Sequence, residues 1–109
     1  MNDNDYKRKV GNIIAKQREY LGLSQEKLAE KADLSFQFIS AIETGRQSFT
    51  ITTLNKLCRA LHMSADKIVF GEENQTDTQQ ITALIQTIDE KYLPLAEEHI
   101  KTFIKTISM

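Results

Sequence analysis

The side chains best suited to chemistry in this chain lie together on one short segment, and their chemistry is hydrogen bonding. Ser35 and Ser40 carry hydroxyl groups, and Gln37 carries an amide that both donates and accepts hydrogen bonds. Such an amide can pair with N7 and N6 of adenine at the same time. Phe36 can contact a thymine methyl group, and Ala41 falls on the same side of the segment. The segment is therefore equipped to contact the edges of DNA bases.

Two short helices joined by a tight turn must position this segment, and residues 21–45 predict them. Ser24 and Ser35 are good N-caps, because a serine hydroxyl accepts a hydrogen bond from a free amide of the first helical turn. Gly22 can adopt the left-handed conformation that closes the preceding helix, and Gly45 ends the second one. The turn between them spans about three residues, as expected in a helix-turn-helix. The second helix would then enter the DNA major groove with its N-terminal residues facing the bases.

The sequence SQEKLAEKADLS, followed by FISAIETGR, resembles the phage Cro and repressor (Xre) helix-turn-helix family. The resemblance covers roughly residues 6–70 and implies an all-α fold, with a five-helix repressor-like DNA-binding domain. It also implies that Arg18 and Glu43 form an ion pair that braces the first helix against the end of the third. The family more often has a polar residue at the position of Phe36, for which packing against its own helix or a partner is the alternative.

Contacts with the DNA backbone are expected at two places. The resemblance implies that Gln25, in the first turn of its helix, bonds a phosphate and often supports the recognition helix, and the free amides there also favour an anion. The loop after the third helix is the second place, where Arg46 is the only cation. The expected phosphate-binding set is Ser24, Gln25, Arg46, Gln47, Ser48 and Thr50. The basic cluster at residues 7–9 could reach the flanking backbone, although simple solvation explains it equally well.

The chain divides into a DNA-binding domain at residues 1–71, a polar linker at 72–77 and a C-terminal helical segment at 78–109. The first of five helices is expected near residues 6–21, and Thr50 and Ser64 can cap the fourth and fifth. Residues 1–71 hold eleven lysines and arginines against eight acidic residues, whereas the remainder holds three against seven. With so small a basic excess, DNA affinity should come from a few well-placed contacts and from dimerisation.

Two amphipathic helices, at residues 78–91 and 95–107, are expected after the linker, with Pro94 between them. Each carries apolar residues at i, i+3, i+4 and i+7, which line one helix face. An isolated hairpin leaves much of this surface in water, so it needs a partner. We expect the same hairpin of a second subunit to cover it with two-fold symmetry, and folding back onto the N-terminal domain is the alternative. The expected dimerisation residues are Ile81, Leu84, Ile85, Ile88, Ile100, Phe103, Ile104 and Ile107.

Composition and motifs argue against several other classes of protein. Cys58 is the only cysteine among 109 residues, so no internal disulfide can form, and its place on an apolar stripe indicates a core residue. The lack of a run of about 20 apolar residues and of a signal-peptide pattern predicts a soluble, cytoplasmic protein without membrane contact. His62 and His99 are isolated, so no metal site is expected. Without a nucleophile–base cluster or a glycine-rich phosphate loop, neither an enzyme nor a cofactor is expected.

Taken together, these features predict a sequence-specific transcriptional regulator, by default a repressor, that binds double-stranded DNA with a palindromic operator as a homodimer. Its paired recognition helices would enter successive major grooves about 34 Å apart. The alternative is an antitoxin or anti-regulator whose C-terminal helices bind another protein, with DNA binding serving autoregulation.

Overall fold

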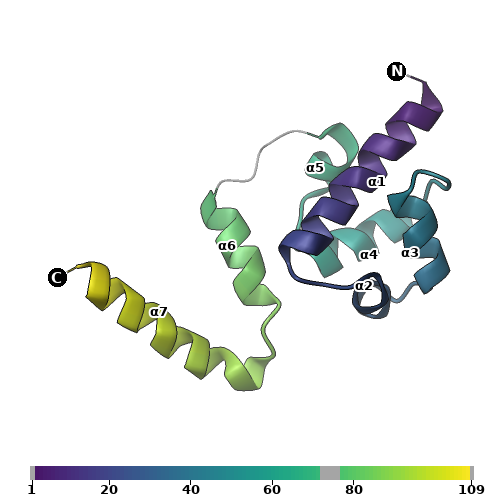
Figure 1. The fold of residues 1–109 in the computed structure, drawn as a ribbon. Coiled ribbons are helices and arrows are strands. Elements are labelled where there is room, and N and C mark those ends of the chain that lie inside the picture. Colours follow the sequence, from purple (N-terminus) through teal and green to yellow (C-terminus); the bar gives the residue numbers. More distant parts are fainter. Residues whose placement is uncertain (1, 72–76, 109) are drawn as a thin grey trace.

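The computed structural model describes residues 2–71 and 77–108, and every regular element within those ranges is a helix (Figure 1). The expected all-α fold class is confirmed. The predicted linker lies outside the described residues except for its last position, where α6 begins. The elements are α1 Asp3–Tyr20, α2 Gln25–Ala32, α3 Phe36–Glu43, α4 Ile51–Leu61, α5 Ala65–Phe70, α6 Asp77–Gln86, the 3₁₀ helix η1 Glu90–Tyr92 and α7 Leu93–Ile107.

Side-chain caps begin the first five helices, and those of α2 to α5 are the N-caps predicted from the sequence. At α2 to α5, a hydroxyl accepts a hydrogen bond from the amide three residues later, at 3.0 to 3.2 Å. These caps are Ser24, Ser35, Thr50 and Ser64. The first helix begins at Asp3 rather than near Tyr6, because Asn2 caps it by accepting a bond from the Asp5 amide at 2.8 Å.

Left-handed residues separate the helices around the helix-turn-helix. Asp33 ends α2 with φ 55°, which an aspartate tolerates better than most residues. Gly45 follows α3 with φ 76°, and a Cβ atom there would lie 2.8 Å from Cγ of Arg8. Both the backbone conformation and the close approach of α1 therefore require glycine at this position.

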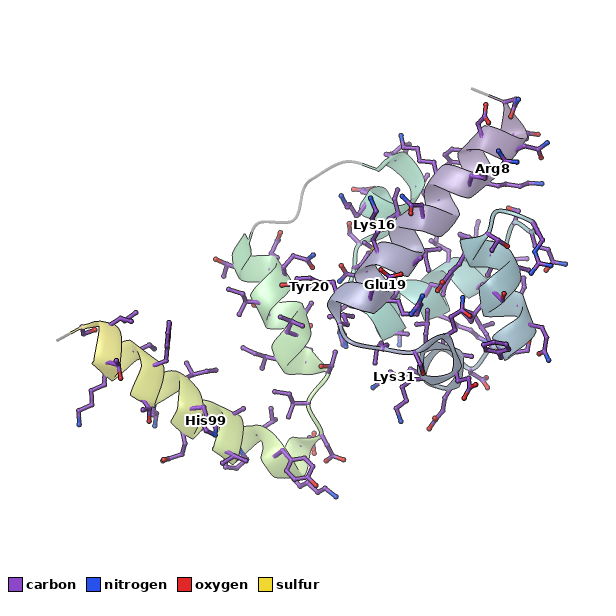
Figure 2. All side chains as sticks on the ribbon, in the orientation of Figure 1. Arg8, Lys16, Glu19, Tyr20, Lys31 and His99 are labelled. Carbon is purple, nitrogen blue, oxygen red and sulfur yellow. The ribbon has the colours of Figure 1, made fainter. Side chains whose placement is uncertain are left out.

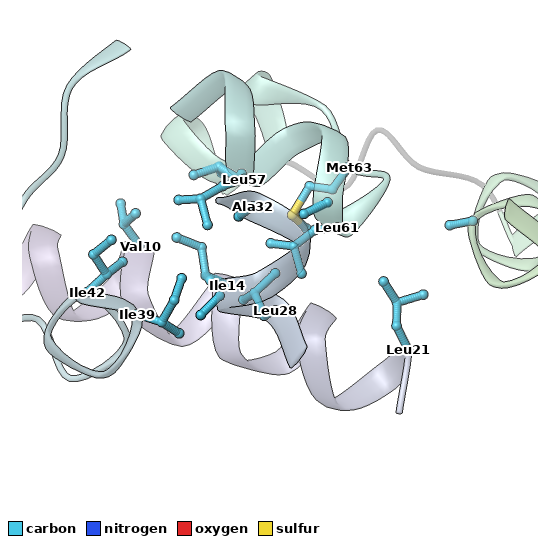
Figure 3. Close-up of a cluster of buried hydrophobic side chains, with 14 residues drawn as sticks. Val10, Ile14, Leu21, Leu28, Ala32, Ile39, Ile42, Leu57, Leu61 and Met63 are labelled. Atoms are coloured by element: carbon cyan, nitrogen blue, oxygen red, sulfur yellow. The ribbon is translucent and has the colours of Figure 1, made fainter. Parts of the chain in front are cut away.

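One hydrophobic core joins the first five helices (Figure 3). Burying one of its large side chains contributes about 1.5 to 3 kcal/mol relative to leaving it exposed. The most completely buried are Ile14, Leu28, Ile39, Ile42, Leu57, Leu61 and Ile68. At Gly11, α1 approaches α3 so closely that an added Cβ atom would collide with the carbonyl oxygen of Ile42. This contact fixes the position of α3 against α1.

α6 packs against the end of α1 in its own chain (Figure 1). Ala83 is only 2% exposed, and Leu84 packs against the core, although the sequence predicts Leu84 at a dimer interface. Gln17 and Gln80 exchange a pair of amide hydrogen bonds, each of 3.2 Å, and Gln17 also donates to the Leu61 carbonyl oxygen at 3.0 Å. The alternative of folding back therefore holds for α6, because Ala83 is buried with the core and Gln80 is bonded to α1.

α7 extends away from the first five helices, at an angle to α6 (Figure 1). It begins at Leu93 rather than at residue 95, with Pro94 in its first turn, where proline fits a helix. The preceding helix stops at Gln86 instead of continuing to residue 91, and η1 fills part of the gap. Large apolar side chains remain exposed along α7; they are Leu93, Leu95, Ile100, Phe103, Ile104 and Ile107. No helix within the described ranges combines the length and apolarity needed to cross a membrane.

Candidate nucleic-acid interface

α3 has a buried face and an exposed face. Ile39 and Ile42 lie on the buried face, within the core. At the N-terminal turn Phe36 is 44% exposed and Gln37 is exposed too, while Ser40, one turn further on, is half-buried. These three side chains share one side of the helix because they are spaced by three and four residues. The N-terminal half of that side is the part of a helix that can reach base edges in the major groove.

Two of the expected base-reading residues have structural roles. The Ser35 hydroxyl accepts the Phe38 amide at 3.1 Å and caps α3. Ala41 is buried, and its carbonyl oxygen accepts the amides of Arg46 and Gln47 at 2.9 and 3.3 Å. With its side chain buried, Ala41 has little surface to offer a base, contrary to the expectation from its helix position. The sequence carries no local signal for this burial, which arises from tertiary packing.

A hydrogen-bond network around Glu43 joins the first three helices. Arg18 donates from Nε to Oε2 of Glu43 at 2.7 Å and from Nη2 to Oε1 at 3.0 Å. Its third bond runs from Nη1 to the Leu23 carbonyl oxygen at 2.8 Å. The bond to Glu43 raises the pKa of the Arg18 guanidinium. The ion pair implied by the family resemblance is therefore present, with side chains 13% and 5% exposed.

Gln25 enters the same network from the first turn of α2. Its Nε2 donates to Oε1 of Glu43 at 3.0 Å, which holds the side chain against the end of α3. Ser24, beside it, is exposed, and its hydroxyl accepts the Lys27 amide as the cap of α2. The helix N-terminus and the side-chain amide of Gln25 thus lie together on a fixed support. Such a helix N-terminus favours an anion.

The loop after α3 carries the other expected phosphate-binding residues. Arg46, Gln47 and Ser48 are exposed. Nε of Arg46 donates to Oγ1 of Thr44 at 3.0 Å, which orients the guanidinium along the loop. Thr50 is exposed and caps α4 with its hydroxyl, so this loop ends at a second helix N-terminus.

The basic cluster at residues 7–9 does not form a single surface, because successive helix residues point about 100° apart. Arg8 lies against Gly45, beside the loop after α3 (Figure 2). Lys9 instead lies beside Gly71, at the end of α5. Arg8 is therefore placed with the expected phosphate-binding loop, a distinction that the run of three charges in the sequence did not reveal.

The remaining reactive side chains have ordinary surroundings. Cys58 packs against the core, as predicted, and burial raises the pKa of its thiol. Within the described part of the chain, no group of three or more histidine, cysteine, aspartate or glutamate side chains is arranged to hold a metal ion.

Five helices around one core, with an exposed N-terminal turn on the second helix of a helix-turn-helix, define a DNA-binding domain. A family model described as helix-turn-helix (HTH_3) matches residues 14–68, which is half of the chain, and the chain belongs to this family. It is a DNA-binding transcriptional regulator, and its relatives and fold are those of regulators rather than enzymes.

Curated relatives and a solved structure agree with this assignment. An uncharacterised HTH-type transcriptional regulator, y4dJ of Sinorhizobium fredii, is 35% identical over 65 residues, which are 60% of this chain and 84% of that protein. Control protein C.MunI of a Mycoplasma species is 33% identical over 73 residues, 66% of this chain and 99% of its own. The crystal structure of the restriction-modification controller protein C.AhdI from Aeromonas hydrophila matches with a TM-score of 0.56 and 27% identity, over 57% of this chain and 94% of that one.

Proposed function

We propose that this regulator is a homodimeric, sequence-specific repressor that acts in the cytoplasm on a palindromic operator. The observation that carries the proposal is the exposed N-terminal turn of α3, with Phe36 and Gln37 facing water on a helix whose other side is buried. The network around Glu43 supports this helix from both α1 and α2. Side chains held on such a rigid support can select bases with little loss of conformational entropy.

Gln37 is the main base-reading residue in this proposal, through a bidentate pair with adenine. Phe36 contacts a thymine methyl group, and Ser40 donates to a base or a nearby phosphate. Ser35 keeps its hydroxyl engaged in the cap of α3, so it contributes by position. Ala41 is left out of the proposed set because it is buried.

The phosphate contacts are assigned to two helix N-termini and the loop between α3 and α4. Gln25 and the first-turn amides of α2 bind one phosphate, with Ser24 as the cap that orients the turn. Arg46, Gln47 and Ser48 bind the next, beside the capped start of α4 at Thr50. Arg8 is added to this set because it lies against the same loop.

Dimerisation is assigned to α7, together with the apolar residues of α6 that do not serve its own core. Residues 93, 96, 100, 103 and 107 follow the alternating three-and-four spacing of a heptad repeat, and Ile104 widens that stripe. A hollow of about 420 Å³ lies between α6 and α7, with Ile85 on one side and Leu93 and Ile100 on the other. A second copy related by two-fold symmetry can fill this hollow with its own α7 while receiving the first copy in return. The proposed interface consists of Ile81, Ile85, Ile88, Leu93, Ala96, Ile100, Phe103, Ile104 and Ile107.

This proposal keeps residues 1–71 as the DNA-reading part and 72–77 as the linker, but it gives the segment 78–109 two tasks. α6 attaches this segment to the DNA-binding domain of its own chain, and α7 joins the two copies. The second candidate is that α7 binds a different protein, as an antitoxin or anti-regulator would. The exposed apolar side of α7 fits either partner, and the mass of the purified protein in solution distinguishes a homodimer from a monomer that awaits a different partner.

The base and phosphate assignments are tested by comparing Gln37→Ala with Gln25→Ala. A random-library selection with the purified protein first supplies the half-site, and fluorescence anisotropy then measures binding to it and to a scrambled duplex. We expect Gln37→Ala to weaken binding to the selected site alone, by about 1 to 3 kcal/mol, because it removes a base pair contact. Gln25→Ala should weaken binding to both duplexes, because a phosphate carries no sequence information.

Gln86→Ala is the matched control, since Gln86 is exposed at the end of α6 and takes no part in the proposed contacts. Thermal melting of each variant shows whether its fold is intact. If both α2 and α3 variants bind the selected site as tightly as the unchanged protein, the site assignment is wrong. A single half-site from the selection, rather than two inverted ones, would count against the palindromic operator.

A further inference from the structure

A cavity of about 190 Å³ lies behind the loop between α3 and α4. Its floor belongs to the core, because the buried residues Val10, Ile42 and Ile68 line it. Phe49 and Leu54 add further apolar wall. An apolar cavity of about 150 Å³ in another protein is large enough to bind benzene. This cavity therefore has the size and the lining for one ring-sized or branched apolar group.

The lining also includes one positively charged residue and several polar ones. Within the part of the chain that the structure describes, Lys7 is the one cationic residue of the lining, and Tyr6, Gln47, Ser48 and Thr50 are its polar residues. None of the described residues that line the cavity is acidic. A cation without an opposing carboxylate favours an anion, and the apolar floor favours a hydrocarbon body. The combination selects a small molecule with one negative charge and a ring or branched chain.

The outer wall of the cavity is part of the phosphate-binding loop proposed above. Gln47, Ser48 and Thr50 all line the cavity. The opposite wall, α1, is held by its close packing against α3 at Gly11 and against the loop at Gly45. A ligand in the cavity would therefore displace the loop more readily than α1.

We propose that this cavity binds a small aromatic or branched-chain monocarboxylate and that its occupancy weakens operator binding. The carboxylate pairs with Lys7, and the hydrocarbon part contacts Val10, Phe49 and Leu54. A negative charge behind the loop repels a DNA phosphate in front of it, and the two ligands oppose each other reciprocally. The effect on DNA rests on the phosphate contacts proposed above, whereas the binding of the carboxylate does not.

The binding is tested by titrating the full chain with sodium benzoate and following backbone amide resonances by NMR. We expect saturable shifts centred on Phe49, Leu54 and Val69, which line or adjoin the cavity. Benzyl alcohol has a similar ring without the charge, and it should bind about tenfold more weakly, since a charge-assisted contact is lost. Shifts that stay linear to the solubility limit, centre on another part of the chain, or follow protein concentration rather than benzoate would overturn the proposal.

Two variants locate the ligand within the cavity. Lys7→Gln should remove the preference for benzoate over benzyl alcohol, whereas Lys16→Gln should keep it, because Lys16 lines a different groove that faces α6 (Figure 2). Leu54→Phe should fill the cavity and abolish the shifts for both molecules, with circular dichroism to check that the variant is folded. If Leu54→Phe does not fold, Lys7→Gln alone decides, and an unchanged preference in that variant overturns the proposal.

The coupling to DNA is measured separately, by anisotropy with the selected operator at saturating benzoate. We expect the operator Kd to rise about fivefold in the unchanged protein, whereas Lys7→Gln at the same benzoate concentration should show a smaller rise, because it binds benzoate more weakly. Saturable benzoate binding with an unchanged operator Kd would overturn the coupling while leaving the carboxylate site in place. A failed half-site selection bears on the DNA assignment only, because the NMR titration contains no DNA.

Discussion

Glu43 is the residue at which α1, α2 and α3 meet. Its carboxylate accepts hydrogen bonds from Arg18 and Gln25 at 2.7 to 3.0 Å, and only 5% of its side chain is exposed. Glu43→Ala leaves the Arg18 guanidinium largely buried without its partner. We expect this variant to lose about 3 kcal/mol of unfolding free energy, and urea denaturation measures the loss.

The control for this variant is an ion pair at the surface. Lys27 and Glu30 approach to 3.6 Å with both side chains more than half exposed, so Lys27→Ala should cost less than about 1 kcal/mol. The paired replacement of Arg18 by Met and Glu43 by Leu should recover stability lost in Glu43→Ala, because it leaves no buried charge. An unaltered urea midpoint in Glu43→Ala would show that other contacts hold α3 in place.

His62 ends α4 in the left-handed conformation, with φ 51°. Burial, and then the nearby charge of Lys31, lower the pKa of His62 from its ordinary 6.5. As pH falls through that value, the unfolded chain binds the proton first, so the free energy of unfolding decreases. His62→Asn tolerates the left-handed backbone and removes this contribution. Its melting temperature should therefore fall less than that of the unchanged protein between about pH 7.5 and 5.

His99→Asn serves as the control for loss of a histidine, because His99 is exposed on α7. Equal pH dependence of melting in His62→Asn and the unchanged protein would contradict the prediction.

Exposure of Phe36 and Gln37 could be predicted from local rules, namely a serine cap followed by isoleucines spaced three apart. The Arg18–Glu43 ion pair could not be predicted from local rules, because no such rule pairs residues 25 positions apart. Its prediction rested on the family resemblance. Burial of Ala41 and the placement of Arg8 against Gly45 depend on tertiary packing, which a helix period does not contain.

The close contact between α1 and α3 depends on Gly11, which has no side chain. Alanine is a better helix former than glycine by about 1 kcal/mol, which alone predicts that Gly11→Ala stabilises α1. The added Cβ would collide with the Ile42 carbonyl oxygen, however, and would force the two helices apart. Because overpacking costs about 1 to 3 kcal/mol and the colliding atom is backbone, we expect a net loss near 2 kcal/mol.

Asn12→Ala, at the next and exposed position of the same helix, should be neutral or slightly stabilising. Thermal melting of the two variants measures both effects. A Gly11→Ala variant that melts at or above the temperature of the unchanged protein would show that α1 and α3 can separate at little cost. The starts of α2 to α5 were predictable from serine and threonine caps, whereas the end of α6 at Gln86 was not, because the apolar stripe continues to Ile88.

In the whole molecule, α6 and α7 have the same spacing of apolar residues but different surroundings. α6 packs on its own chain and α7 does not, although their stripes are alike in the sequence. The difference lies in two residues of α6 outside the apolar stripe: Ala83 is buried with the core, and Gln80 bonds Gln17 of α1. An apolar stripe in the sequence identifies a helix face that must be buried. The shape and hydrogen bonding of the neighbouring residues determine which surface buries it.

The proposed role of α7 predicts the effect of a charge on its exposed stripe. Phe103 is 65% exposed, so Phe103→Lys leaves the fold of the single chain intact. The same change at a dimer interface would bury an unpaired charge, which disfavours the dimer. We therefore expect sedimentation equilibrium to show the 12.5 kDa monomer for this variant and a species of twice that mass for the unchanged protein. Operator affinity should fall with it, since one half-site binds more weakly than two.

Thr102→Lys adds the same charge outside the heptad positions and should leave the dimer unchanged. If the unchanged protein sediments as a monomer at micromolar concentration, the homodimer is wrong and the second candidate, a different protein bound by α7, becomes the working hypothesis.

The amide pair between Gln17 and Gln80 has a consequence for ionic strength. Neither side chain carries a net charge, so dissolved salt does not screen the bonds that attach α6 to α1. Contacts with DNA phosphates weaken steeply as salt rises, because cations return to the DNA. A salt concentration that releases the regulator from DNA therefore leaves α6 bound to α1.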